Sequence, residues 1–173
     1  VLATCEALRA RGIVPVVMPS SPLMHTAGLA NSLPFQMLGG RCVTLPNRSF
    51  DPMEIWRTVA RERVMCMIIV GDAFAKPILR ALDAEPGRWD LSSLVGIVSS
   101  GVMWSQETKT RLLEHHPGMV LMDAFSSSEA LGMGSSVSAA GATAETAKFV
   151  LSPDTIVIDD LNRPLTPGSG EIG

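Results

Sequence analysis

The sequence lacks three features that would point to particular partners. Its 14 lysines and arginines are scattered singly and the net charge is −3, so it offers no basic stripe for nucleic acid or an anionic membrane surface. Its longest apolar stretches, such as residues 65–70, are far too short to span a bilayer. It also has no charged start followed by an apolar signal region. We therefore expect a cytoplasmic protein with no transmembrane segment and no nucleic-acid partner.

Cysteine motifs and nucleophile motifs are equally sparse. The three cysteines, Cys5, Cys42 and Cys66, lie far apart and form no Cys-x-x-Cys or Cys/His ligand pattern. This spacing favours buried free thiols in a reducing compartment over a metal site. The sequence also has no Gly-x-Ser-x-Gly elbow, which counts against a serine hydrolase of similar fold class.

What the sequence does contain is the composition of a folded domain, or of a large part of one. Among its 173 residues, 46% are hydrophobic and 18% are charged. Short apolar runs alternate with amphipathic segments, and the runs suit strands buried on both faces of a parallel sheet. These runs are residues 14–18, 42–45, 65–70, 94–98 and 119–122. The pattern predicts an α/β fold, with a layered, largely parallel sheet and helices on both faces.

Helix-start signals lie between the predicted strands. Asp51 followed by Pro52 predicts an N-cap and the first helical position of one helix. Asp72 and Ser105 begin two further candidate helices. The last part of the sequence predicts different structure, because it is rich in small residues.

For that last part, residues 131–147 predict a strand and a flexible loop, because Gly, Ser and Ala dominate there. Residues 155–159 predict a final short strand, and residues 160–163 predict the turn that follows it. No internal repeat or long linker divides the chain.

Two of the predicted strands end in segments suited to binding a ligand. In open α/β sheets, ligands bind beyond the carboxyl ends of the strands. The small residues at 99–103 would let a flat ring or a phosphate approach the backbone closely. Residues 123–129 combine an aromatic ring, three hydroxyls and acidic side chains, which could bind phosphate oxygens and Mg²⁺. Hydroxyl-rich segments are most often ordinary loops, so composition alone leaves both interpretations open.

Histidines provide a third candidate feature. His25 follows the first predicted strand and could face a ligand, or it could be a hydrogen-bonded histidine that caps the next helix. His115 and His116 close a predicted helix, where a positive charge near the helix C-terminus is the simpler interpretation.

Taken together, these segments resemble the adenylate-forming superfamily: acyl-CoA synthetases, aryl-CoA ligases, luciferases and peptide-synthetase adenylation domains. Members carry a Pro-Leu-Phe-His-x-x-Gly segment, a Gly-Gly before a strand, a Phe-Asp-Pro helix start, a Ser-Gly-Gly-Ala-Pro-like turn and an aromatic-Gly-x-Thr-Glu motif. The segments that correspond to these motifs are, in the same order, residues 22–28, 39–43, 50–52, 99–103 and 125–129. Two more family segments are matched by Asp-Leu-Ser-Ser-Leu at 90–94 and by the turn into Gly-Glu-Ile at 162–173. The resemblance covers nearly the whole chain, and these motifs in register are far more specific than any one of them.

The resemblance implies roles for two segments in holding the nucleotide. Glu129 would help to bind the Mg²⁺ that accompanies ATP. Ser128 stands where the family usually has threonine and would bond the α-phosphate. Phe125 would stack beside adenine. The surroundings of the ring would be formed by Gly101, Val102, Met103, Asp123, Ala124 and Ser126.

The resemblance also implies the position of the acyl substrate. His25 would lie at the junction of carboxylate, acyl pocket and phosphate. The acyl tunnel would be lined by Ala27, Ser100 and Gly101. The sequence departs from the family where Ser100 and Ser126 replace glycines and so add small side chains near the nucleotide. The basic residue that often meets CoA is replaced by Ser49, with Arg48 one place earlier, which leaves the CoA contact in doubt.

Other parts of the family's active site lie outside these motifs. The phosphate loop with its lysine should lie upstream of residue 1. The ribose-binding aspartate, the hinge and the C-terminal domain with its catalytic lysine should lie downstream of residue 173. We therefore expect residues 1–173 to be a partial AMP-binding (adenylation) domain that holds one wall of the site and is inactive by itself.

The complete protein would then be an AMP-forming acyl-CoA ligase, with Mg²⁺ and ATP, and with CoA as co-substrate. The ten methionines and the absence of tyrosine suit an adaptable apolar tunnel, which favours a fatty or other bulky apolar acid over an aromatic one. The alternative is a non-catalytic α/β nucleotide- or acyl-binding module derived from such a ligase. No motif in the sequence indicates an oligomeric state.

Overall fold

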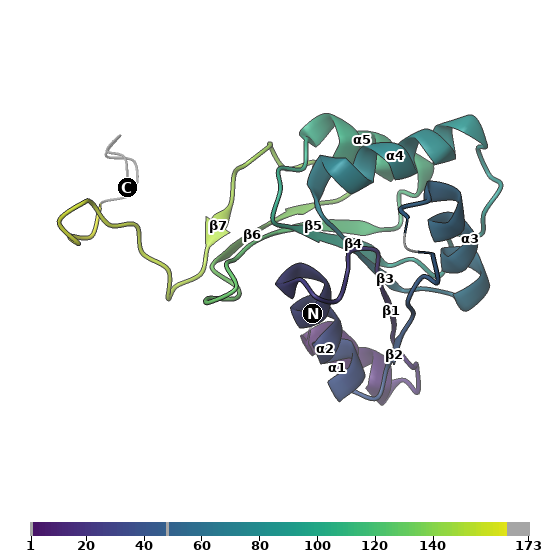
Figure 1. Cartoon of the computed structure of the whole chain (residues 1–173), viewed down its shortest axis with the longest axis horizontal. Coiled ribbons are helices and arrows are strands. Elements are labelled where there is room, and N and C mark those ends of the chain that lie inside the picture. Colours follow the sequence, from purple (N-terminus) through teal and green to yellow (C-terminus); the bar gives the residue numbers. More distant parts are fainter. Residues whose placement is uncertain (1, 48, 166–173) are drawn as a thin grey trace.

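The computed structural model describes residues 2–47 and 49–165. Their strands form one sheet in the order β2-β1-β3-β4-β5-β6-β7 (Figure 1). Strands β2 to β5 in this order run parallel, whereas β6 and β7 are antiparallel to their neighbours. The strands are β1 (Val16–Pro19), β2 (Arg41–Cys42), β3 (Cys66–Ile69), β4 (Gly96–Ser100), β5 (Val120–Phe125), β6 (Gly134–Ser138) and β7 (Val150–Leu151). The predicted α/β fold with a largely parallel sheet is confirmed.

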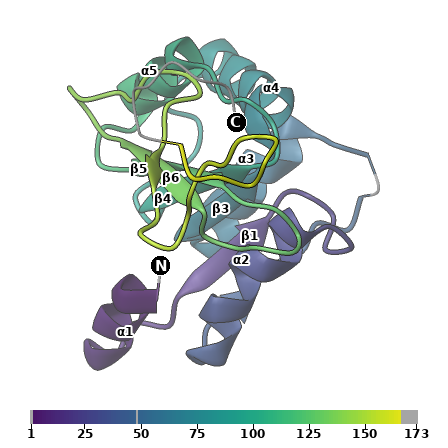
Figure 2. The same ribbon diagram turned by 90° about the vertical axis from the view of Figure 1, so that its left-hand side faces the viewer.

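Helices cover both faces of the sheet, as predicted. Figure 2 shows α1 and α2 below the sheet and α4 and α5 above it. The helix on the same face as α4 and α5 is α3. The helices are α1 (Leu2–Ala10), α2 (Thr26–Met37), α3 (Pro52–Glu62), α4 (Gly71–Ala84) and α5 (Gln106–His115).

The alternation of side chains along the strands explains these two layers. In β3, Met67 and Ile69 pack into the cluster that contains Trp56 of α3, whereas Ile68 packs with Phe35 of α2 on the other face. All three β3 side chains are fully buried, as expected for a strand with helices on both sides. The indole N–H of Trp56 donates to the carbonyl of Ile78 at 2.8 Å, so the α3–α4 contact has no unsatisfied polar group at this point.

The predicted helix starts are confirmed to within one residue. The Asp51 carboxylate accepts a hydrogen bond from the N–H of Met53 at 2.8 Å and caps α3. The Ser105 hydroxyl accepts from the N–H of Thr108 at 3.4 Å and caps α5. Helix α4 begins at Gly71, one residue before the predicted start at Asp72.

Several predicted strand boundaries were wrong. Strand β4 continues to Ser100 and β5 to Phe125, so residues 99–100 and 123–125 belong to strands and not to the loops that follow. Strand β2 is only two residues long. The apolar pattern at 155–159 forms no strand but a single bridge between Ile158 and Pro164, and the last strand of the described chain is β7. The turn predicted at residues 160–163 is present, since the N–H of Asn162 donates to the carbonyl of Asp159 at 3.0 Å.

The three cysteines are free thiols, as predicted. Cys5 is buried and packs with Phe35, and burial raises the pKa of Cys66 to about 12. No helix among the described residues is both long and apolar enough to cross a membrane. Arg48 and the Gly-Glu-Ile segment at 166–173 lie outside the described residues.

Candidate functional site

A cavity of about 940 Å³ opens at the carboxyl ends of β4 and β5, beside the N-terminus of α2. This is the edge of a parallel sheet where α/β proteins bind ligands. The cavity brings together seven of the predicted site residues: His25, Ala27, Ser100, Gly101, Ala124, Ser126 and Ser128. They come from segments far apart in the sequence, so the topology of the sheet is what assembles them.

His25 occupies the N-cap position of α2, and its carbonyl accepts from the N–H groups of Gly28 and Leu29, each at 3.1 Å. Its side chain makes no capping hydrogen bond. The ring is exposed and lines the cavity. His25 therefore caps α2 through its backbone and not through its side chain, and the position of its ring suits a ligand contact.

The loop at 126–132 is organised by two of its three serines. The Ser126 hydroxyl accepts from the N–H of Gly132 at 3.0 Å, and the Ser127 hydroxyl accepts from the N–H of Ala130 at 3.1 Å. The Ser128 hydroxyl instead lies 3.0 Å from the hydroxyl of Thr26, the first residue of α2. These two hydroxyls, 102 positions apart in sequence, both line the cavity and could both donate to an oxyanion. Thr26 is a candidate residue that sequence reasoning missed, although it directly follows His25.

Glu129 follows Ser128 on this loop and is exposed, but it does not line the cavity. No group of three or more His, Cys, Asp or Glu side chains among the described residues could hold a metal ion. A single exposed carboxylate is compatible with Mg²⁺, which is commonly held by one or two carboxylates together with substrate phosphates.

The glycine-containing turn after β4 lies only partly on the cavity. Gly101 lines it and has φ +89°, a backbone conformation that favours glycine. Val102 and Met103 are exposed and do not line the cavity. Gly101 thus faces the cavity, whereas Val102 and Met103 face solvent.

Phe125, the predicted adenine-stacking residue, ends β5 and is exposed. Its ring centroid lies 5.5 Å from that of Phe149, with the planes tilted by 35°. Neither ring lines the cavity. Phe149 is a second aromatic residue that sequence reasoning did not include.

Asp123 points away from the cavity. Its carboxylate is buried on the α5 face of the sheet, 4.0 Å from the ammonium of Lys109, which is 1% exposed. Burial raises the pKa of Asp123 to about 6, and the charge of Lys109 partly offsets this effect. Burial likewise lowers the pKa of Lys109, against the attraction of Asp123 and Asp72. The Asp123 side chain is therefore not on the cavity, whereas Ala124 on the opposite face does line it.

The remaining histidines have structural partners. His115 Nε2 lies 2.8 Å from a carboxylate oxygen of Asp83, and His116 Nε2 lies 2.9 Å from the carbonyl of Leu94. Both residues are at the C-terminal end of α5 and away from the cavity, so they are not site candidates.

Comparisons with known proteins show which proteins this chain is similar to. The chain is 35% identical over 162 residues to the 3-oxocholest-4-en-26-oate–CoA ligase of Rhodococcus rhodochrous, an alignment that covers 90% of this chain and 28% of that protein. It is 36% identical over 155 residues to the medium-chain acyl-CoA ligase Mig of Mycobacterium avium, covering 88% of this chain and 28% of that protein. The chain therefore spans 28% of the length of these curated relatives.

Solved structures share the fold. A structure described as a long-chain-fatty-acid CoA ligase from Rhodopseudomonas palustris superposes on 96% of this chain and 40% of that one, with a TM-score of 0.66 and 24% identity. The luciferase-like enzyme of the mealworm Zophobas morio superposes on 95% of this chain and 41% of that one, with a TM-score of 0.64 and 14% identity. The family of AMP-binding enzymes matches residues 1–173, the full chain, and this chain belongs to that family.

Proposed function

We propose that the full-length protein is an acyl-CoA ligase that activates a fatty or other bulky apolar acid with Mg·ATP and then forms the CoA thioester. The observation that carries this proposal is the cavity, which gathers His25, Ser128 and Gly101 at one sheet edge. Membership of the AMP-binding enzyme family and the names of the relatives support the same reaction class. Residues 1–173 would supply one wall of the site, in a cytoplasmic enzyme acting on small molecules.

The reaction would proceed in two steps. The substrate carboxylate attacks the α-phosphorus of ATP, which gives the acyl-adenylate and releases pyrophosphate. The thiol of CoA then attacks the acyl carbon and displaces AMP. Neither step needs a covalent protein intermediate, so positioning and charge stabilisation would supply most of the rate enhancement.

The described residues can be given roles in the first step. The hydroxyls of Thr26 and Ser128 would donate to phosphate oxygens, and His25 would hold the reacting carboxylate near them. Gly101 would let the nucleotide approach the backbone at the end of β4. Mg²⁺ at Glu129 would neutralise part of the phosphate charge.

The walls of the cavity support an apolar acyl group. Small and apolar side chains dominate the walls formed by α2, by β5 and by the loop after β5; these are Ala27, Ala30, Pro34, Met122, Ala124 and Leu131. Its size lies at the upper end of the range for small-molecule pockets. The names of the relatives include medium- and long-chain fatty acids and a steroid acid, all of them bulky and apolar.

The test is an ATP–pyrophosphate exchange assay on the full-length protein with a panel of fatty, steroid and aromatic acids. We expect exchange that depends on an apolar acid, and thioester formation when CoA is added. Nucleotide binding with no exchange for any acid would contradict the proposal and favour the non-catalytic binding module.

A second test concerns the size of the acyl group. Ala27→Phe is expected to lower kcat/KM for long or polycyclic acids by about tenfold, because the added ring fills part of the cavity. Short acids should be affected much less. The measurement is the exchange rate across an acyl chain-length series.

The matched control for this test is Leu29→Phe. Leu29 lies on the same helix but is exposed and does not line the cavity, so the chain-length profile should be unchanged. Equal profiles for both variants and the wild type would show that the acyl group does not lie beside Ala27.

A further inference from the structure

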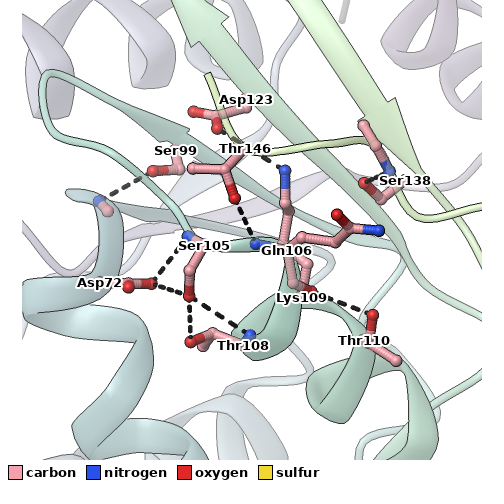
Figure 3. Close-up of polar contacts among 12 residues, drawn as sticks. Asp72, Ser99, Ser105, Gln106, Thr108, Lys109, Thr110, Asp123, Ser138 and Thr146 are labelled. Atoms are coloured by element: carbon pink, nitrogen blue, oxygen red, sulfur yellow. Dashed lines mark hydrogen bonds and ion pairs between the residues drawn. The ribbon is translucent and has the colours of Figure 1, made fainter. Parts of the chain in front are cut away.

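The turn at residues 101–104 connects β4 to α5 and is held on both sides by the first residues of α4. On the β4 side, the N–H of Gly71 donates to the hydroxyl of Ser99 at 2.9 Å. On the α5 side, the N–H and the hydroxyl of Ser105 both donate to Oδ1 of Asp72, at 3.0 and 3.1 Å (Figure 3). The two flanks of the turn are therefore fixed to a single rigid element.

The main chain of the turn also contacts α4 directly. The N–H of Asp72 donates to the carbonyl of Met103 at 3.0 Å. A Cβ atom on Gly71 would lie 2.5 Å from the carbonyl oxygens of both Val102 and Met103, and Gly71 has φ +50°. Only glycine permits this approach without displacing the turn, because real Cβ atoms do not come so close to backbone oxygens. The conformation of residues 102–103 is thus dictated by the start of α4.

Both oxygens of the Asp72 carboxylate are occupied. Oδ1 accepts from Ser105, and Oδ2 lies 3.0 Å from the ammonium of Lys76. Burial alone would raise the pKa of Asp72, but the hydrogen bonds from Ser105 and Lys76 and the charge of Lys76 outweigh it and lower the pKa below its usual value. The carboxylate is therefore ionised at neutral pH, and its hydrogen bonds to Ser105 are charge-assisted.

We propose that Asp72 is a positioning residue for the nucleotide base, acting through the turn at 101–104. It would hold the backbone of Gly101, Val102 and Met103 in the conformation against which adenine lies. This inference rests on the proposed function, because it takes the turn to be the adenine wall. Asp72 does not line the cavity and would act only through the turn, so its effect should fall on recognition of the base and not on the phosphates or the acid.

Asp72→Asn in the full-length protein is expected to weaken AMP binding about tenfold, the size of effect expected when one charge-assisted hydrogen bond is lost. The same variant should lower the preference for ATP over GTP, since a displaced turn discriminates less between bases. The KM for the acid should stay unchanged. Titration calorimetry with AMP, and exchange kinetics with ATP, GTP and varied acid, measure these three quantities.

A matched control lies on the same helix. The carboxylate of Asp83 also joins α4 to α5, through Arg111 at 2.6 Å and His115 at 2.8 Å, but it is far from the turn in the hydrogen-bond network. Asp83→Asn should therefore leave AMP affinity and base preference unchanged. If both variants weaken AMP binding equally, the cause is general loosening of the two helices, and the proposed role of Asp72 is overturned.

A second variant keeps the proposal testable if Asp72→Asn does not fold. Ser105→Ala removes the hydroxyl donor but keeps the N–H bond to Asp72, so it should weaken AMP binding in the same direction by about threefold. The positioning role is overturned if Asp72→Asn keeps the AMP affinity and base preference of the wild type. If Asp72→Asn does not fold, the same result for Ser105→Ala overturns it. Either result leaves the proposed function standing. A wild-type protein that binds no adenine nucleotide would instead overturn the proposed function, and the inference with it.

Discussion

Lys109→Met is expected to lower the free energy of unfolding by about 3 kcal/mol, the low end of the range for breaking a buried ion pair. The substitution leaves the Asp123 carboxylate buried without its cation. The low end applies because the two charged groups are 4.0 Å apart and the Lys109 ammonium has no hydrogen-bond partner among the described residues. Urea unfolding of the full-length protein, together with hydrogen exchange of the β4 and β5 amides, measures the loss.

Two comparisons separate the charge effect from simple loss of packing. Lys109→Met combined with Asp123→Leu replaces the pair by apolar side chains, and should recover most of the stability. Lys148→Met removes an exposed lysine that pairs with Glu145, and should cost less than about 1 kcal/mol. A cost for Lys109→Met no greater than that for Lys148→Met would show that the buried pair contributes nothing.

The pair also explains why the sequence could predict the strand at β5 but not its end. Apolar runs predicted β1, β3, β4 and β5 because each of these strands contributes buried apolar side chains to the core. Asp123 is polar, so the pattern assigned it to a loop, yet it lies in the strand and is 5% exposed. Its burial depends on Lys109, which comes from α5, and no local pattern reports such a partner.

The last strand shows the opposite case. Residues 155–159 have a strand-like apolar pattern, but Ile156 is 67% exposed and has no neighbouring strand among the described residues. Strand β7 forms instead where Val150 and Leu151 pair with Gly134 and Ser135 of β6. A strand needs an available edge as well as a suitable sequence, and the edge is a property of the whole sheet.

Some residues of the candidate site can likewise be predicted from the sequence, and others are recognised only from the fold. Residues within contiguous motifs, such as His25, Gly101 and Ser128, could be predicted, and the cavity brings them together. Thr26 and Phe149 could not, since their significance comes from contacts with Ser128 and Phe125 across the fold. Asp123 and Ala124 are neighbours on β5 and lie on opposite faces of the sheet, a separation that assigning residues 123–129 to a loop does not predict.

Glu129→Gln in the full-length protein is expected to slow ATP–pyrophosphate exchange by a factor on the order of 100, comparable to removing one electrostatic contact to a transition state. The amide is neutral and would hold Mg²⁺ weakly beside the phosphates. Part of the lost rate should return at high Mg²⁺ concentration if this is the cause. Stability should not change, because Glu129 is exposed on a loop.

Glu145→Gln is the matched control, since Glu145 is also an exposed carboxylate, but it pairs with Lys148 and does not adjoin the cavity-lining Ser128. It should leave both the exchange rate and the Mg²⁺ dependence unchanged. Exchange by Glu129→Gln at the wild-type rate would remove Glu129 from the mechanism. A slow rate that high Mg²⁺ does not improve would instead assign Glu129 to the geometry of the loop, where Ser128 is held against Thr26. The Mg²⁺ titration therefore decides whether this carboxylate acts through its charge or through its position.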